Sequence, residues 1–202
     1  MSNEVRIKNT GLRGVTVADS AISFIDGEKG ILIYRGYRVE DLAERSNFLE
    51  TVYLLLFGAL PNEEQLAAFS GRLRARRALP PFVLESMQLY PKTALPMDVL
   101  QASVPLLAMA DTNPRAEERE AVVERAIGLI AQLPTVVAAW HRIRSGKEVI
   151  APDDSLDHAE NFLWMLQGTK PEAQMAKDLD VCLVLHADHT FNAHAGGGQR
   201  HA

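Results

Sequence analysis

The 202-residue sequence contains a single cysteine and has no long hydrophobic run. Because Cys182 cannot form an internal disulfide, the class of small disulfide-stapled proteins is excluded. We interpret Cys182, which lies in an apolar stretch, as a small core residue. The longest apolar runs, such as Tyr53–Phe57, are too short to span a bilayer, so no membrane association is expected. The sequence also lacks a recognisable secretory leader, which favours a cytoplasmic location.

Charge of one sign is not concentrated anywhere along the chain. The formal net charge is −5, and the basic residues are scattered instead of forming a stripe. A nucleic-acid partner is therefore not expected. We interpret the basic run Arg74–Arg77 and the pair Asp153-Asp154 as solvated charge. The proportions of 47% hydrophobic and 23% charged residues are typical of a folded globular protein.

Only one region has the pattern of β-structure, and it lies near the N-terminus. Two short β-prone runs, residues 22–25 and Ile31–Tyr34, flank a turn that contains Gly27 and Gly30. This arrangement predicts a β-hairpin near residues 21–34. Because two short strands cannot form a core alone, the hairpin is expected to pack against another part of the protein.

From Val39 onward the sequence has the start and stop signals of helices. The pairs Asn47–Glu50, Asn62–Gln65 and Thr169–Glu172 have the spacing of capping boxes. Pro81 and Pro96 are suited to the first turn of a helix, and the second of these helices is apolar nearly all round, so it should be buried on more than one side. Further helices are expected over residues 115–145 (one or two, depending on Pro134), 156–167 and 171–189. The predicted fold class is mainly α, a helical bundle with one short N-terminal hairpin.

Histidines near the end of the chain are candidates for chemistry. His186 and His189 are three residues apart and would share one face of the last predicted helix. Without other information, two roles are open. The histidines could stabilise a helix C-terminus by interacting favourably with the helix dipole, or they could be ligand-binding or catalytic residues. A metal site built from His186, Asp188, His189 and His194 is disfavoured, because no second cluster of ligands is visible elsewhere. His141 and His158 are interpreted as surface or capping residues, and Trp140 and Trp164 as packing residues.

A series of short segments, in the same order along most of the chain, resembles the citrate synthase family in its shorter bacterial and archaeal form. Residues 11–193 carry the resemblance, through Gly11-Leu12-Arg13-Gly14-Val15, Ile25-Asp26-Gly27, Tyr34-Arg35-Gly36-Tyr37, Tyr53-Leu54-Leu55-Leu56-Phe57-Gly58, Pro96-Met97, Pro134-Thr135-Val136-Val137-Ala138-Ala139, His158-Ala159-Glu160-Asn161-Phe162-Leu163-Trp164-Met165 and Leu185-His186-Ala187-Asp188-His189 with Asn192-Ala193.

The resemblance implies an acyl-CoA condensing transferase. Members of the family join acetyl-CoA to oxaloacetate, or propionyl-CoA in methylcitrate synthases, and the sequence leaves this choice open. His189 matches the histidine that contacts oxaloacetate, and His186 and Asn192 match flanking, supporting positions. The family implies no resident cofactor, with acetyl-CoA as co-substrate. It also implies a homodimer or larger assembly formed through the helices at Pro96–Ala110 and Arg115–Ser145.

The chain departs from the family pattern after Asn192-Ala193. Family members continue for nearly as long again, with a Leu-His-Gly histidine, a base aspartate and carboxylate-binding arginines that have no counterpart here. We therefore expect a truncated or frameshifted reading frame. Residues 1–192 would be the N-terminal part of the large helical domain, and residues 193–202, with three consecutive glycines, a disordered tail. The small domain and C-terminal half would be absent, and the chain alone inactive. A non-catalytic dimerisation or binding module and a non-functional remnant remain alternatives.

Overall fold

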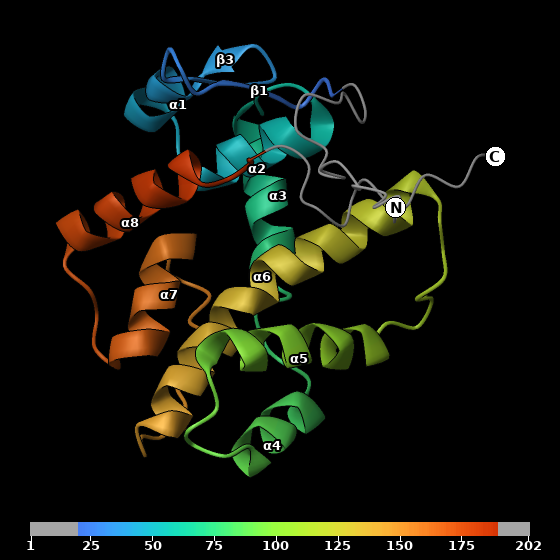
Figure 1. Cartoon of the computed structure of the whole chain (residues 1–202), viewed down its shortest axis with the longest axis vertical. Coiled ribbons are helices and arrows are strands. Elements are labelled where there is room, and N and C mark those ends of the chain that lie inside the picture. The colour runs from blue at the N-terminus through green and yellow to red at the C-terminus, as the bar shows by residue number, and fades with distance from the viewer. Residues whose placement is uncertain (1–19, 190–202) are drawn as a thin grey trace, which may run out of the picture.

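The computed structural model describes residues 20–189, in which a small antiparallel sheet precedes a set of helices (Figure 1). Its elements are β1 (Ser23–Asp26), β2 (Ile31–Tyr34), β3 (Tyr37–Arg38), α1 (Val39–Arg45), α2 (Phe48–Phe57), α3 (Glu63–Arg74), α4 (Pro81–Leu89), α5 (Pro96–Met109), α6 (Arg119–Arg144), α7 (His158–Gln167) and α8 (Ala173–Leu185). The mainly α fold class is confirmed. The predicted tail, residues 193–202, lies outside the described residues.

The predicted hairpin is confirmed, and it carries a third short strand that the sequence pattern did not indicate. β1 pairs antiparallel with β2, and β2 pairs antiparallel with β3. The turn between β2 and β3 places Arg35 at φ 49° and Gly36 at φ 92°, so both residues have the left-handed conformation of a tight two-residue turn. Hydrogen bonds from Arg35 to the carbonyls of Ile22 (2.8 Å) and Leu55 (3.0 Å) hold the non-glycine residue there.

Two of the three predicted capping boxes are present. Both partners of the Asn47–Glu50 and Asn62–Gln65 pairs exchange hydrogen bonds at the starts of α2 and α3. The prediction for Thr169–Glu172 is wrong, because α8 begins only at Ala173 and its N-cap Glu172 makes no side-chain cap bond. Pro171 accounts for the difference, since the residue before a proline is disfavoured in helical angles.

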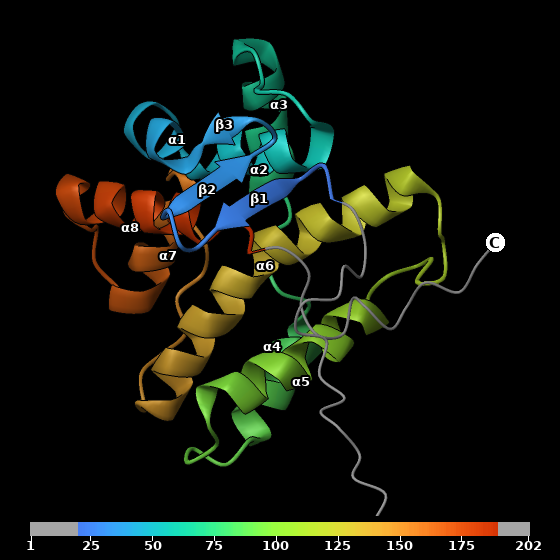
Figure 2. The ribbon, with the colours of Figure 1, turned by 45° about the horizontal axis from the view of Figure 1, so that its top comes forward.

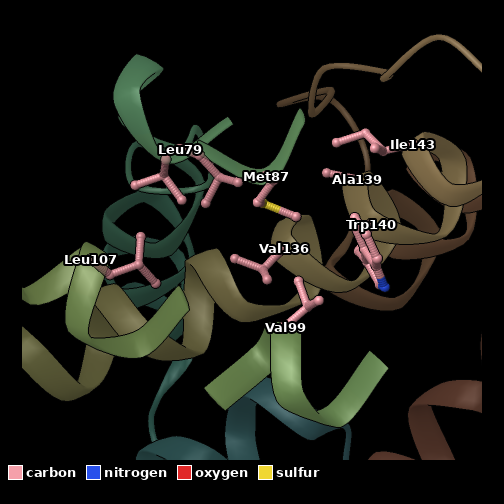
Figure 3. Close-up of a cluster of buried hydrophobic side chains, with 9 residues drawn as sticks. Leu79, Met87, Val99, Leu107, Val136, Ala139, Trp140 and Ile143 are labelled. Carbon is pink, nitrogen blue, oxygen red and sulfur yellow. The ribbon is translucent and has the colours of Figure 1, made fainter. Parts of the chain in front are cut away.

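Helix α6 is the central element of the described chain. It is one continuous helix that includes Pro134, and it crosses between α4 and α5 on one side and α3 and α7 on the other (Figures 1 and 2). By length and apolarity alone it could span a membrane, and in the described chain it packs against these four helices. Side chains from α4, α5 and the segment before α4 converge on α6 in the largest apolar cluster (Figure 3), which includes Leu79, Val83, Met87, Val99, Leu107, Val136, Ala139, Trp140 and Ile143.

Helix α5 is buried on one face only within the single chain. Val99, Ser103 and Leu107 face the core, and the Ser103 hydroxyl is satisfied by the carbonyl of Val99 at 2.7 Å. Met97 and Met109 are 70% and 72% exposed. The expectation that this helix is buried on more than one side is therefore not met by contacts inside one copy of the chain.

Candidate functional site

The structure places the candidate histidines at and beyond the end of α8. The helix ends at Leu185, and the backbone N–H of His186 closes its last turn with the carbonyl of Cys182 at 3.2 Å. His189 follows in non-helical chain, and both histidines are exposed. The expectation that they share a helix face is wrong, because the helix stops before either residue. Asn192 lies outside the described residues.

The N-terminal sheet holds the main chain of this histidine segment, residues 186–189. The Tyr34 hydroxyl donates to the carbonyl of Asp188 at 3.1 Å and accepts the Asp188 backbone N–H at 3.3 Å. The Ser23 hydroxyl donates to the Asp188 carboxylate. Ser23 and Tyr34 are direct cross-strand partners, so their side chains lie on the same face of the sheet. Residues more than 150 positions apart in sequence are thereby joined.

Apolar packing supports these hydrogen bonds. Tyr34 and Val184 are both fully buried, in a cluster with Val39, Leu42 and Leu54 against which Ala187 also packs. Burial raises the pKa of Tyr34 above its ordinary value, so the phenol keeps its proton at neutral pH and can donate. The end of α8 is thus fixed from two sides, by the cluster and by the sheet.

The two histidine rings have different surroundings. The Nδ1 atom of His186 lies 2.7 Å from the carbonyl oxygen of Cys182, which assigns the Nδ1 proton to that bond and leaves Nε2 to accept. Within residues 20–189, no hydrogen bond to the exposed His189 ring is formed. A solvent-facing imidazole on a fixed main chain can donate a hydrogen bond to an anion.

The interpretation of Cys182 as a core residue is wrong, because its side chain is exposed. Helix α8 buries only a narrow stripe that contains Ala176 and Val184. Cys182 is two residues before Val184, which places it about 200° away around the helix, on the solvent side.

A second set of polar residues, remote in sequence from the histidine segment, is buried although no sequence pattern indicates it. Arg77 is 2% exposed, and its guanidinium donates to the carbonyls of Asp153 and Leu156 at 2.9 Å each. The interpretation of this arginine as solvated charge is therefore wrong. Its backbone carbonyl also accepts a hydrogen bond from the hydroxyl of Thr135 on α6. Arg77 thereby fastens the loop before α7 to the core.

His158 is likewise buried, contrary to its interpretation as a surface or capping residue. Its ring is 6% exposed and lies 5.2 Å from the ring of Phe48, centre to centre. Burial and, to a lesser extent, the positive charge of Arg77 together lower the pKa of His158 to about 4. His158 is the first residue of α7. Its side chain points into the protein because α7 packs on both α6 and α8.

Two cavities in the described part of the chain are lined by residues other than His186 and His189. The larger, of about 560 Å³, lies among α2, α3, α7 and α8 and includes His158 and Asp180 in its wall. The Asp180 carboxylate accepts the backbone N–H of Phe48 at 3.1 Å, so it caps the start of α2 from across the cavity. No group of three potential metal-ligating side chains occurs among residues 20–189.

Acid should destabilise the protein through His158. Its pKa is about 4 in the folded chain against 6.5 for an ordinary histidine, so the unfolded chain binds more protons between these values. The stability contributed by the neutral ring is complete above pH 6.5 and is lost as the pH falls toward and below 4, a loss on the order of 3 kcal/mol. Urea unfolding at several pH values measures it.

The matched control is His158→Leu, which keeps an apolar side chain against Phe48 and cannot titrate. The variant should lose less stability than the parent over the same interval. Asp180 works in the opposite sense, because burial raises its pKa and its protonation favours the folded chain. Its contribution is common to both proteins and cancels in the comparison. An equal pH dependence in the two proteins would contradict the assignment.

Comparison with known proteins places this fold and its histidine segment in a family. Residues 11–195 match the family described as citrate synthase, C-terminal domain. The chain is 44% identical over 197 residues to the citrate synthase of Haloferax volcanii, covering 96% of this chain and 51% of that protein. It is 40% identical over 188 residues to 2-methylcitrate synthase 1 of Corynebacterium glutamicum, covering 91% and 49%.

The crystal structure of citrate synthase from Pyrobaculum aerophilum superposes with a TM-score of 0.84 at 39% identity, covering 89% of this chain and 47% of that one. The chain belongs to the citrate synthase family. It spans about half the length of the relatives it matches.

Proposed function

We propose that this chain supplies the oxaloacetate-contacting segment of a citrate synthase, which condenses acetyl-CoA with oxaloacetate to give citrate and CoA in the tricarboxylic acid cycle. The observation that carries the proposal is the fixed segment 186–189, which presents the exposed His189 imidazole from a buried, hydrogen-bonded anchor. Membership of the citrate synthase family supports the choice of reaction.

The chemistry assigned to His189 is hydrogen-bond donation to the anionic substrate. Condensation builds negative charge on the ketone oxygen of oxaloacetate, and a donor placed there stabilises the transition state. His186 and Asn192 would support the site from either side. No resident cofactor is needed for this reaction, and acetyl-CoA enters as the co-substrate. The base and the enol stabiliser that complete such a site must act together with His189, so we expect no turnover from the 202 residues alone.

A second candidate reaction is methylcitrate synthesis from propionyl-CoA. It is supported by a relative named 2-methylcitrate synthase 1 that is 40% identical, close to the 44% of the Haloferax volcanii citrate synthase. The two acyl groups differ by one methylene, which a pocket discriminates by about 1–3 kcal/mol. His189 would contact oxaloacetate in either reaction, so its role does not depend on this choice.

Titration with oxaloacetate, followed by NMR of the histidine rings, tests the role of His189. Addition of oxaloacetate should shift the ring signals of His189, with a smaller effect on those of His186. His141, which is exposed and belongs to α6, serves as the internal control for non-specific binding of the dianion. Equal shifts at His141 and His189 would contradict the proposal.

The same proposal includes an assembly and a location. Residues 1–192 would form part of the large helical domain of the enzyme, with residues 193–202 as a tail, and two copies would associate as a homodimer in the cytoplasm. The support for association is the exposed outer surface of α5, hereafter the α5 outer face, which contains Met97, Val104 and Met109. A non-catalytic dimerisation module would use the same face.

A further inference from the structure

The pairing of β1 with β2 places two hydroxyl groups side by side. Ser23 is directly opposite Tyr34 in the register, and both hydroxyls bond to Asp188, the residue immediately before His189. One bond reaches the Asp188 carboxylate, and the other two reach its backbone carbonyl and N–H. A shift of the register by one residue would turn both side chains to the opposite face of the sheet.

We propose that Tyr34, assisted by Ser23, is a positioning residue that fixes the main chain of the histidine segment so that His189 meets its substrate in one orientation. The inference rests on the proposed function, in which His189 contacts oxaloacetate. Consecutive Cα atoms are held about 3.8 Å apart, so clamping both backbone polar groups of Asp188 leaves His189 few main-chain positions. Tyr34 and Ser23 would make no contact with the substrate. They would influence substrate binding only by holding Asp188 and thereby positioning His189.

The ring and the hydroxyl of Tyr34 have separable tasks. The ring is fully buried among Val39, Leu42, Leu54 and Val184, and this packing contributes to the stability of the fold. The hydroxyl is directed at the chain end of α8, where it bonds to Asp188. Tyr34→Phe removes the hydrogen bonds to Asp188 and keeps the packing, because phenylalanine retains the ring.

The experiment compares Tyr34→Phe with Tyr53→Phe in the full 202-residue chain. Tyr53 packs its ring against Phe57 and Phe69, and its hydroxyl makes no hydrogen bond within the described residues. In Tyr34→Phe the Asp188 amide loses its bond to the Tyr34 hydroxyl, which should speed exchange of the Asp188 amide proton by about fivefold to tenfold. The His189 ring signals should move toward those of a free histidine, and their saturation should need about fivefold to tenfold more oxaloacetate.

Ser23 gives a second, independent pair of variants. Ser23→Thr keeps a hydroxyl on β1 and should retain the parent signals, whereas Ser23→Ala should reproduce part of the Tyr34→Phe effect. Amide exchange in α6 should be the same in all variants, since the apolar cluster around α6 does not include Ser23, Tyr34 or Asp188. A uniform rise in exchange across α6 and Asp188 would indicate a purely structural role and would overturn the proposal.

The outcomes separate the positioning role from the proposed function. If Tyr34→Phe leaves Asp188 exchange and the His189 signals no more changed than Tyr53→Phe does, the positioning role is overturned, whatever oxaloacetate does. If Asp188 exchange rises but oxaloacetate fails to shift His189 even in the parent chain, the clamp on the segment is supported and the proposed function fails. Local loosening together with weaker oxaloacetate binding supports both.

Discussion

Replacement of Arg77 by alanine is expected to lower the free energy of unfolding by about 3–5 kcal/mol. The guanidinium is 2% exposed and is the donor to the carbonyls of Asp153 and Leu156. Its removal takes a donor away from the buried carbonyl of Leu156 and from the half-buried carbonyl of Asp153, and it opens a cavity beneath the loop before α7. Both effects add, because the loop cannot collapse into the space without breaking its contact with α7.

Two control variants make the Arg77 result specific. Arg74→Ala removes an arginine of the same run whose ion pair, among the described residues, is with the largely exposed Asp157, so its cost should be at most about 1 kcal/mol. Arg77→Met keeps much of the volume but none of the donors, and should fall between the two. Urea unfolding of the three variants measures these differences. A loss for Arg77→Ala no larger than that for Arg74→Ala would contradict the account of the buried arginine.

Placing glutamate at Met97 and Met109 is expected to weaken self-association of the chain by about a hundredfold or more. Burial of a methionine side chain contributes about 1.5–3 kcal/mol, and a buried, unpaired carboxylate adds a further cost. The two residues are 70% and 72% exposed on the α5 outer face, so the substitutions should leave the folded monomer intact.

Sedimentation equilibrium of the parent and of the double variant measures the effect. Met175→Glu is the matched control, because this methionine is also exposed but lies on α8, away from α5 (Figure 1). It should leave association unchanged. A well-behaved monomer for the parent chain at micromolar concentration would contradict the proposed homodimer.

Local signals in the sequence predicted those parts of the fold that local interactions determine. The capping boxes at Asn47 and Asn62 each join residues three positions apart, so the sequence alone contains both partners. The hairpin is similarly local. The false signal at Thr169 has the correct spacing but encloses Pro171, and the restriction that proline places on its neighbour outweighs the pattern.

Burial of polar residues could not be predicted, because it depends on partners remote in sequence. In the sequence, nothing distinguishes Arg77 from Arg74 and Arg76, and it is the loop before α7 that buries it. His158 is buried by the approach of Phe48 on α2. The apolar stretch around Cys182 predicts a core position, but only one stripe of α8 faces inward and Cys182 is outside it.

The family resemblance supplies the candidate residues of the site, but no sequence pattern predicts what holds them in place. Resemblance to the family indicated His189, His186 and Asn192, and whether these residues meet a substrate stays a prediction. The clamp by Ser23 and Tyr34 was not foreseen, since no pattern links β1 and β2 to a segment more than 150 residues away. The hairpin register seen in the structure, in which Ser23 pairs with Tyr34, shows that the two hydroxyls lie on one face of the sheet.

Reconstitution of the whole reaction tests the central claim, that His189 is the oxaloacetate-contacting histidine of a citrate synthase, most directly. Residues 1–193 would be joined to the second half of the Haloferax volcanii citrate synthase, and CoA release from acetyl-CoA followed with oxaloacetate present. We expect the fused protein to release CoA only with oxaloacetate, and His189→Ala to lower kcat/KM by about a hundredfold or more, whereas His141→Ala should not. A folded, active fusion whose rate is unchanged by His189→Ala would contradict the claim.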